Sequence, residues 1–322
     1  MKRIIKIIEK FYSYRPATIF IILIGLVTIF SVFSPNHTFL NLKVITSILR
    51  ITPILGIVSI GVTILMICGE FDLSVGSILA FCSMIMAILF SNGMNVFLAA
   101  FIALIIGAFV GMLNGIITVK FGIPSFITTL GMMMILRGVV LLLSEGMPIS
   151  FHPEQKHHIF SSIFVGNILG IPMQFIWFLG VAFLFWIVLE HHKFGNWVYA
   201  TGGNKEAARA MGIPTNKTKI ICFIIVGILC AFSGIIETTR IYSSYPLQAE
   251  GMNLLAISAT VIGGTALSGG VGTIIGTVCG AILIQVIDTG LLLLRAPAFW
   301  FRTFIGMLII LVVIINKYLR RR

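Results

Sequence analysis

Apolar runs long enough to cross a lipid bilayer recur along the whole of this 322-residue sequence, and they limit the folds open to it. A hydrocarbon core about 30 Å thick needs about 20 mostly apolar residues per helix. Charged residues make up only 10% of the chain, compared with roughly 25% in soluble domains. The sequence therefore predicts an all-α integral membrane protein with about ten transmembrane helices in a single domain, residues 1–322. The ten expected spans are residues 16–33, 47–68, 73–91, 96–118, 124–143, 174–190, 220–237, 253–268, 272–294 and 299–316.

The formal net charge of +12 is distributed in a way that indicates topology rather than nucleic-acid binding. With a cytoplasmic N-terminus, fifteen of the 22 Lys and Arg residues fall in inside segments and six in outside segments or at their borders, which favours cytoplasmic termini. The inside set is Lys2, Arg3, Lys6, Lys10, Arg15, Lys120, Lys193, Lys205, Arg209, Lys217, Lys219, Lys317, Arg320, Arg321 and Arg322. The outside set is Lys43, Arg50, Lys156, Arg240, Arg295 and Arg302, and Arg137 falls within a span.

Two connections are longer than the rest, the outer loop 144–173 and the inner loop 191–219. Each is shorter than the roughly 40 residues at which an independent domain becomes plausible. Energy for any transport must therefore come from a partner or from an ion gradient.

The inner loop carries the signals of a short, deliberate helix. Asn204 is a favoured N-cap, residues 205–211 are good helix formers, Gly212 suits a left-handed C-terminal position, and Pro214 prevents continuation. A helix this short is marginal in water, so something must hold it in place.

Within this loop "EAARAMG" matches an E-A-A-x-x-x-G core, and it occurs in order with "SPNHTFLNLKVI", "GEFDLSVGS", "FITTLGMMMILRG", "SGIIE" and "VIGGTALSGGVGTIIGT". Together these motifs resemble, nearly end to end, the permease subunit of ribose-type monosaccharide ATP-binding cassette (ABC) importers. The resemblance implies a multi-pass protein of a bacterial cytoplasmic (inner) membrane. It also implies residues that couple to the ATPase: Asn204, Glu206, Ala207, Ala208, Arg209 and Gly212.

The partners implied by the resemblance are a second permease subunit, a cytoplasmic ABC ATPase and an extracytoplasmic sugar-binding protein, in addition to the lipid bilayer. The sequence contains no G-x-x-x-x-G-K-[ST] motif, so we expect no cofactor on this chain and ATP with Mg²⁺ on the partner ATPase. We expect a transport subunit and no enzyme activity. Three departures from the family pattern concern the identity of the sugar more than the transport class: Glu70, the pair Leu254 and Leu255, and Asp288.

"GEFDLSVGS", residues 69–77, places Glu70 and Asp72 between two apolar runs where carboxylates should be scarce. Asp72 can cap the following helix by accepting hydrogen bonds from backbone N–H groups. Alternatively, the segment is a helix break lining a watery cavity, where sugar hydroxyls meet Asp72 and Ser74. The echo of "LSVGSI" in "LSGGVGTI" suggests a second break near residues 263–272.

Two charges lie at similar depth within expected spans. Arg137 is about 20 Å and Asp288 about 24 Å from the inner ends of their helices at 1.5 Å per residue. Because ionised groups in a membrane need a partner or water, we hypothesise that they pair, directly or through water, beside the outer part of the pathway. The alternative is that Arg137 extends outward to water and Asp288 lies at a frayed helix end.

The remaining polar residues have plainer interpretations. Glu237 and Arg240 end a span on the outer side, either as docking contacts for the binding protein or as ordinary helix-end charges. No metal site is expected from His152, Glu154, His157 and His158 or from His191 and His192, since adjacent histidines diverge. The five cysteines are expected to be small buried hydrophobes.

Glycines spaced four apart, Gly107–Gly111–Gly115 and Gly272–Gly276–Gly280, predict two helix faces where backbones approach closely. The expected function is inward movement of a neutral, ribose-like or related polyhydroxylated solute through half of a pore. The alternative is a stand-alone proton-coupled transporter that uses Glu70, Asp72 and Asp288.

Overall fold

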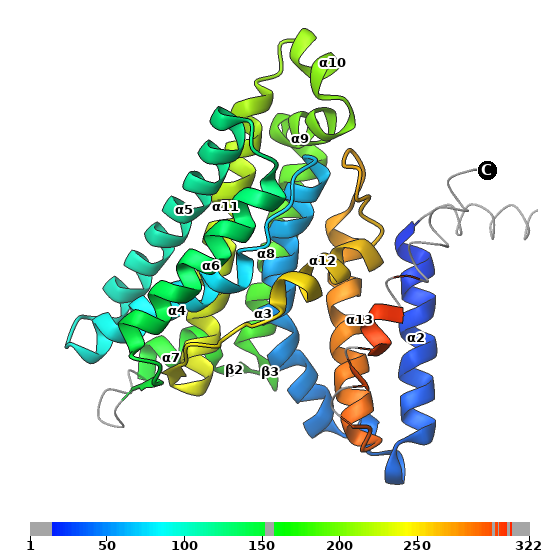
Figure 1. Ribbon diagram of the computed structural model, residues 1–322. Coiled ribbons are helices and arrows are strands. Elements are labelled where there is room, and N and C mark those ends of the chain that lie inside the picture. Colours follow the sequence, from blue (N-terminus) through cyan, green and yellow to red (C-terminus); the bar gives the residue numbers. More distant parts are fainter. Residues whose placement is uncertain (1–14, 152–157, 298–299, 302, 308–309, 311–322) are drawn as a thin grey trace, which may run out of the picture.

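The computed structural model describes residues 15–151, 158–297, 300–301, 303–307 and 310 and is built almost entirely from helices (Figure 1). The elements are α2 (Arg15–Phe33), the 3-10 helix η1 (Pro35–Leu40), α3 (Leu42–Ile67), α4 (Val75–Ser91), α5 (Val96–Phe121), α6 (Ser125–Ser144), α7 (His158–Val165), α8 (Met173–His191), α9 (Lys193–Gly203), α10 (Lys205–Ala210), α11 (Thr215–Ile241), α12 (Met252–Ile262) and α13 (Ile274–Leu293). Two antiparallel pairs of two-residue strands lie in the loops: β1 (Ile149–Ser150) with β4 (Ser243–Ser244), and β2 (Asn167–Ile168) with β3 (Ile171–Pro172).

Within the described residues, six helices are long and apolar enough to cross a membrane: α3, α5, α6, α8, α11 and α13. Three shorter apolar helices, Ile19–Phe33, Val75–Ser91 and Met252–Ile262, coincide with other expected spans. Most of the tenth expected span, 299–316, lies outside the described residues, and so do the chain termini. The helical membrane fold is thus confirmed, while the count of ten and the orientation stay predictions.

Both expected helix breaks are present. The first is shorter than the sequence indicated, since residues 68–74 separate α3 from α4, which begins at Val75. In the second, α12 ends at Ile262 after 11 residues, too few to cross about 30 Å of hydrocarbon, and residues 263–273 precede α13. The prediction of one continuous span over 253–268 is therefore wrong.

The inner loop holds more helix than expected. The sequence predicted one short helix at 205–211, whereas α9 fills residues 193–203 ahead of it and α11 begins as early as Thr215. The start of α9 is capped by His192, whose Nδ1 accepts from the backbone N–H of Phe194 at 3.1 Å. A histidine cap is a weak local signal, and sequence reasoning missed it.

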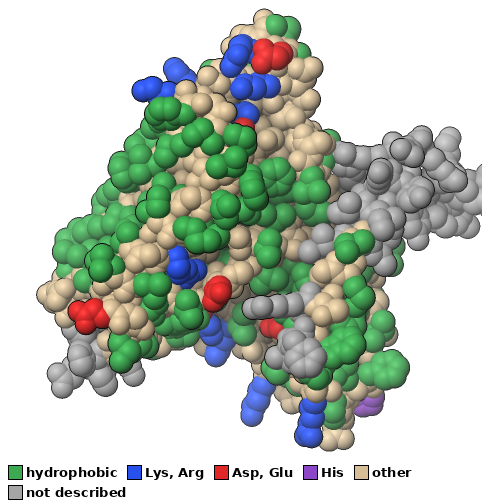
Figure 2. Space-filling view, viewed as in Figure 1, with side chains coloured by type: hydrophobic (Ala, Val, Ile, Leu, Met, Phe, Trp, Pro, Cys, Tyr) green, Lys and Arg blue, Asp and Glu red, His purple; other side chains and the backbone are tan. Residues whose placement is uncertain are grey.

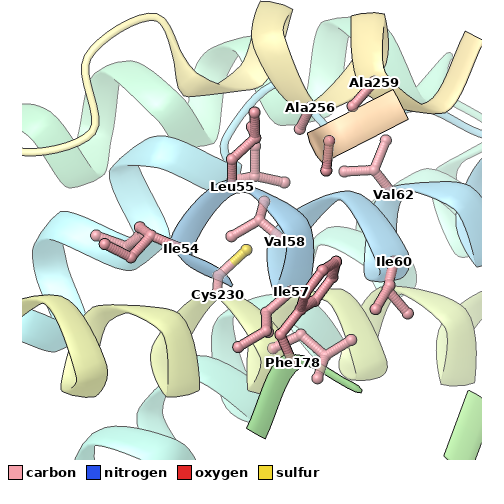
Figure 3. Packing of buried hydrophobic residues seen from close by; sticks show 14 of the residues in the cluster. Ile54, Leu55, Ile57, Val58, Ile60, Val62, Phe178, Cys230, Ala256 and Ala259 are labelled. Atoms are coloured by element: carbon pink, nitrogen blue, oxygen red, sulfur yellow. The ribbon is translucent and has the colours of Figure 1, made fainter. Parts of the chain in front are cut away.

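Helix α3 lies in the middle of the bundle. Figure 3 shows its apolar side chains, among them Ile57 and Val58, packed against Phe178 of α8, Cys230 of α11 and Ala256 of α12. A helix that is apolar all round belongs either inside such a core or in a lipid bilayer. By contrast, only 22% of the apolar windows of α6 and α8 is buried, and the space-filling view shows a largely hydrophobic outer face (Figure 2).

The predicted glycine faces are confirmed with one correction. A Cβ atom added to Gly111 of α5 would overlap the Phe223 carbonyl oxygen of α11, and one added to Gly280 of α13 would overlap the Ala259 carbonyl oxygen of α12. Gly272, however, lies before the start of α13 and shares no helix face with Gly280. It belongs to the second break instead.

Candidate coupling and translocation sites

Helix α10 is terminated at both ends as its sequence indicates. The Asn204 side chain accepts a hydrogen bond from the Ala207 N–H at 3.0 Å. At the other end Gly212 has φ +82°, and the N–H of Ile213 donates to the Ala208 carbonyl at 3.0 Å, which together form a Schellman cap. The short helix is therefore fixed by its own termini.

The outward face of α10 is polar and accessible. Figure 1 shows α10 projecting from one end of the bundle beyond α9, and the charged side chains gathered at that end are visible in Figure 2. The Glu206 side chain is 78% exposed and forms a 3.9 Å ion pair with Arg209. Met211 is 83% exposed, whereas Ala208 is buried and anchors the helix. Of the predicted coupling residues, all but Ala208 are exposed.

The first break is joined to the inner loop by an ion pair. Lys219 Nζ, on the first turns of α11, donates to Glu70 Oε1. The two side chains are only 11% and 13% exposed. No basic residue lies near Glu70 in sequence, so this partner was missed. An acidic residue between apolar runs with no basic residue nearby in sequence indicates a partner that is distant in the chain.

The inner loop also contacts both breaks through backbone atoms alone. We term this contact the glycine junction; it consists of Gly69, Gly202, Gly269 and Gly270. The Gly270 N–H donates to the Ile67 carbonyl at 2.8 Å, and a Cβ atom at Gly202 would overlap that same oxygen. The end of α3, the end of α9 and the second break thus meet at van der Waals distance, which only residues without side chains permit.

Tyr199 of α9 strengthens this junction. Its hydroxyl donates to the Gly272 carbonyl at 2.9 Å. Burial, with the nearby Glu190 carboxylate, raises the pKa of Tyr199 to about 12. The phenol therefore stays protonated and able to donate.

Asp72 forms a buried cluster with Ser74 and Asn114. Its Oδ1 accepts from the Ser74 N–H at 2.7 Å and from the Ser74 hydroxyl, and its Oδ2 accepts from Asn114 Nδ2 at 3.3 Å. The predicted hydrogen bond from the Ser74 N–H is confirmed, but the N-cap residue of α4 is Ser74 and not Asp72. All three side chains are fully buried, and Asn114 was missed although it is a lone amide in an apolar run.

Arg137 and Asp288 form no direct ion pair; the three ion pairs among the described residues involve other side chains. Arg137 donates through Nη1 to the backbone carbonyls of Pro246 and Gln248, the second at 3.2 Å. Asp288 accepts from Gln285 at 3.4 Å. The guanidinium of Arg137 is therefore bound by the loop between α11 and α12 and not by Asp288. No sequence pattern predicts that this loop contacts α6.

Glu237 and Arg240 form a 3.0 Å ion pair with each other at the end of α11. The described residues hold no group of three His, Cys, Asp or Glu side chains placed to bind a metal. His152, Glu154 and His157 lie outside the described residues. The cysteines are free, and four of them are buried, as expected of small hydrophobes.

The described residues form a bundle of apolar helices with two internal breaks and a capped helix presented at one end, which is the architecture of a multi-pass membrane protein. The family described as "Branched-chain amino acid transport system / permease component" matches residues 44–313, and the chain belongs to that family. It is a transport component rather than an enzyme.

Relatives agree over nearly the whole length. Ribose import permease protein RbsC of Escherichia coli (strain K12) is 36% identical over 298 residues, 92% of each chain. Autoinducer 2 import system permease protein LsrC of Photorhabdus luminescens is 33% identical over 92% of this chain and 89% of the relative. D-allose transport system permease protein AlsC of Escherichia coli (strain K12) is 33% identical over 94% of this chain and 91% of the relative. No solved structure matches the chain. The resemblance to ribose-type import permeases is thereby confirmed.

Proposed function

We propose that this chain is the membrane-spanning subunit of an ATP-driven importer for a ribose-like monosaccharide or a related small polyhydroxylated solute. The named solutes of three relatives, ribose, allose and autoinducer 2, support this class. The departures at Glu70, at Leu254 and Leu255, and at Asp288 leave the particular solute open.

ATP hydrolysis takes place on a separate cytoplasmic ATPase, with its own ATP and Mg²⁺, since the sequence has no P-loop. That ATPase docks on α10. The observation that carries this proposal is that the capped, exposed α10 lies between α9 and α11, which contact the two helix breaks through the glycine junction and the Glu70–Lys219 pair. A displacement of α10 therefore acts on both breaks at once.

The translocation path runs along the face formed by α6 and α12. Arg137 lies on a span whose face is otherwise open and apolar, and ionisable groups at membrane depth face a cavity or protein rather than lipid. We infer that a second permease subunit covers this face and that the two enclose the pore. The Arg240 side chain, 30% exposed, is available at the opposite end of α11 from α10 for the extracytoplasmic binding protein.

The test is reconstitution into proteoliposomes with the cassette ATPase and the soluble binding protein from the same genome. Uptake of D-ribose or D-allose is expected only when all three components are present and ATP is supplied on the side of the membrane where the ATPase is bound. Uptake by the permease alone, driven by a proton gradient, would overturn the proposal and support the stand-alone transporter that uses Glu70, Asp72 and Asp288.

A further inference from the structure

A cavity of about 190 Å³ opens on the α6 face, between the start of α4, the middle of α6 and the segment 247–253. One ordered water needs only about 10–15 Å³ of such space, so the cavity has room for a small organic solute. Its polar lining residues are Ser77, Arg137, Glu250 and Asn253. Figure 2 shows a basic and an acidic side chain close together in the middle of this otherwise hydrophobic face.

The cavity offers both donors and acceptors. Both bonds from Arg137 to the 246–248 backbone use Nη1, which leaves the N–H groups of Nε and Nη2 to donate to a solute. Glu250, which interacts electrostatically with this guanidinium, supplies carboxylate acceptors. One cation balanced by one anion suits a neutral ligand, whereas a phosphorylated one would call for additional cations.

Two further polar groups retain hydrogen-bonding capacity. The Ser77 side chain is 1% exposed, and its hydroxyl has no partner among the described residues. The Asn253 amide makes a weak contact of 3.8 Å with the Met133 sulfur. Buried polar groups are normally satisfied, and ten other buried side-chain atoms among the described residues also have no partner. The Ser77 hydroxyl therefore adds hydrogen-bonding capacity to the wall, while Arg137, Glu250 and Asn253 supply the groups that line the cavity.

The walls are held rigidly. A Cβ atom on Gly76 of α4 would overlap the Ala249 carbonyl oxygen, so the segment that carries Glu250 rests directly on the first turn of α4. Arg137 ties the same segment to α6. Donors and acceptors that are fixed before binding lose little entropy when a ligand arrives.

We propose that this cavity is a subsite of the translocation path that binds a neutral, hydroxyl-rich solute of about monosaccharide size. The inference rests on the proposed import function. The hydroxyls meet Ser77, Arg137, Glu250 and Asn253, while the C–H faces of the ring pack on the apolar remainder, including Met133. Since α4 follows the first break and α12 precedes the second, movement of either break reshapes the subsite and releases the solute.

The test uses the reconstituted complex with Glu250→Gln and Asn253→Leu, each close in size to the residue it replaces. The matched controls are Glu145→Gln and Asn167→Leu, which lie on exposed loops away from the cavity. ATP-dependent uptake is first measured for D-ribose, D-allose and ribitol, and the best wild-type solute is then used. The cavity variants are expected to lose about tenfold in uptake rate, the equivalent of one hydrogen bond to a charged group or two neutral ones, and the controls none.

Direct occupancy is measured with Asn253→Cys in a Cys279→Ser background, where the other cysteines are buried. The solute should slow modification by a polar thiol reagent, and an equal concentration of an uncharged solute without hydroxyls should not. If the wild type imports a solute and both cavity variants import it at the same rate, the subsite proposal is wrong and the proposed import function stands. The same holds if the solute does not change the rate of thiol labelling. Absence of wild-type uptake for all three solutes refutes the substrate class and the subsite together. Co-purification of the ATPase with each variant verifies assembly.

Discussion

The buried Glu70–Lys219 pair provides the sharpest test of how the inner loop is connected to the membrane core. The two side chains are 13% and 11% exposed, so neutralising one partner strands the other charge in a place with little water. Breaking such a pair from one side costs about 3–5 kcal/mol, whereas replacing both partners with neutral residues of similar size is often neutral or stabilising. Because some exposure remains, the lower end, about 3 kcal/mol, is expected here.

The variants are Glu70→Gln, Lys219→Met and the double substitution. In detergent, each single variant should have a lower apparent Tm than the wild type, and the double variant should recover most of the loss. Lys217→Met is the control, since Lys217 is an exposed lysine on the same turn of α11 and is expected to leave Tm unchanged.

The same variants separate a structural role from a coupling role. If the pair transmits the movement of α10 to the first break, the double variant will be stable yet will hydrolyse more ATP per solute imported than the wild type. Reversing the charges with Glu70→Lys and Lys219→Glu should lower that ratio again. Single variants with unchanged Tm and unchanged ATP-to-solute ratio would refute the reasoning.

Three further outcomes are expected. Gly212→Val should lower the free energy of unfolding by about 1–2 kcal/mol, since a β-branched residue at φ +82° is strained. A pull-down should show weaker binding of the ATPase to this variant; undiminished binding would count against α10 as the docking site. Gly202→Val should sharply reduce the folded yield in size-exclusion chromatography, because its side chain would overlap the Ile67 carbonyl, whereas Gly203→Val, with open space around it, should not. Asp72→Ala should lower the free energy of unfolding by about 1–3 kcal/mol, because the buried Ser74 N–H and hydroxyl lose their acceptor and Asn114 loses one of its two acceptors. A double change with Asn114→Leu should recover part of this loss in a thermal melt; an unaltered Tm for the single change would contradict the cluster's structural role.

The elements that sequence reasoning located correctly are those with local signals. Asn204 and Gly212 mark the two ends of α10, because a cap is satisfied by backbone groups within a few residues. Asp72 accepts from the N–H of Ser74, the N-cap residue of α4, and so lies just outside that helix. The first break was predicted at 69–77 from the carboxylates of "GEFDLSVGS", and the second near 263–272 from the echo of "LSVGSI" in "LSGGVGTI". The structure places them at 68–74 and 263–273.

The site residues that sequence reasoning misplaced are those whose partners are distant in the chain. Glu70 and Lys219 are 149 positions apart, and Arg137 and Pro246 are 109 apart. The depth argument that paired Arg137 with Asp288 compared positions along two helices without knowing whether those helices are neighbours. Backbone carbonyls of the 246–248 segment were closer.

The sequence by itself therefore determined that this chain is a multi-pass helical membrane protein, where most of its helices lie, where two of them break, and that a capped helix stands on the inner loop. The tertiary structure alone decided which charge meets which, that three glycine-bearing backbones touch, and that a polar cavity opens beside α6. The physical reason is that apolar spans are nearly interchangeable in composition: hydrophobicity commits each one to the bilayer, but only the packing of small residues and the reach of loops selects its neighbours.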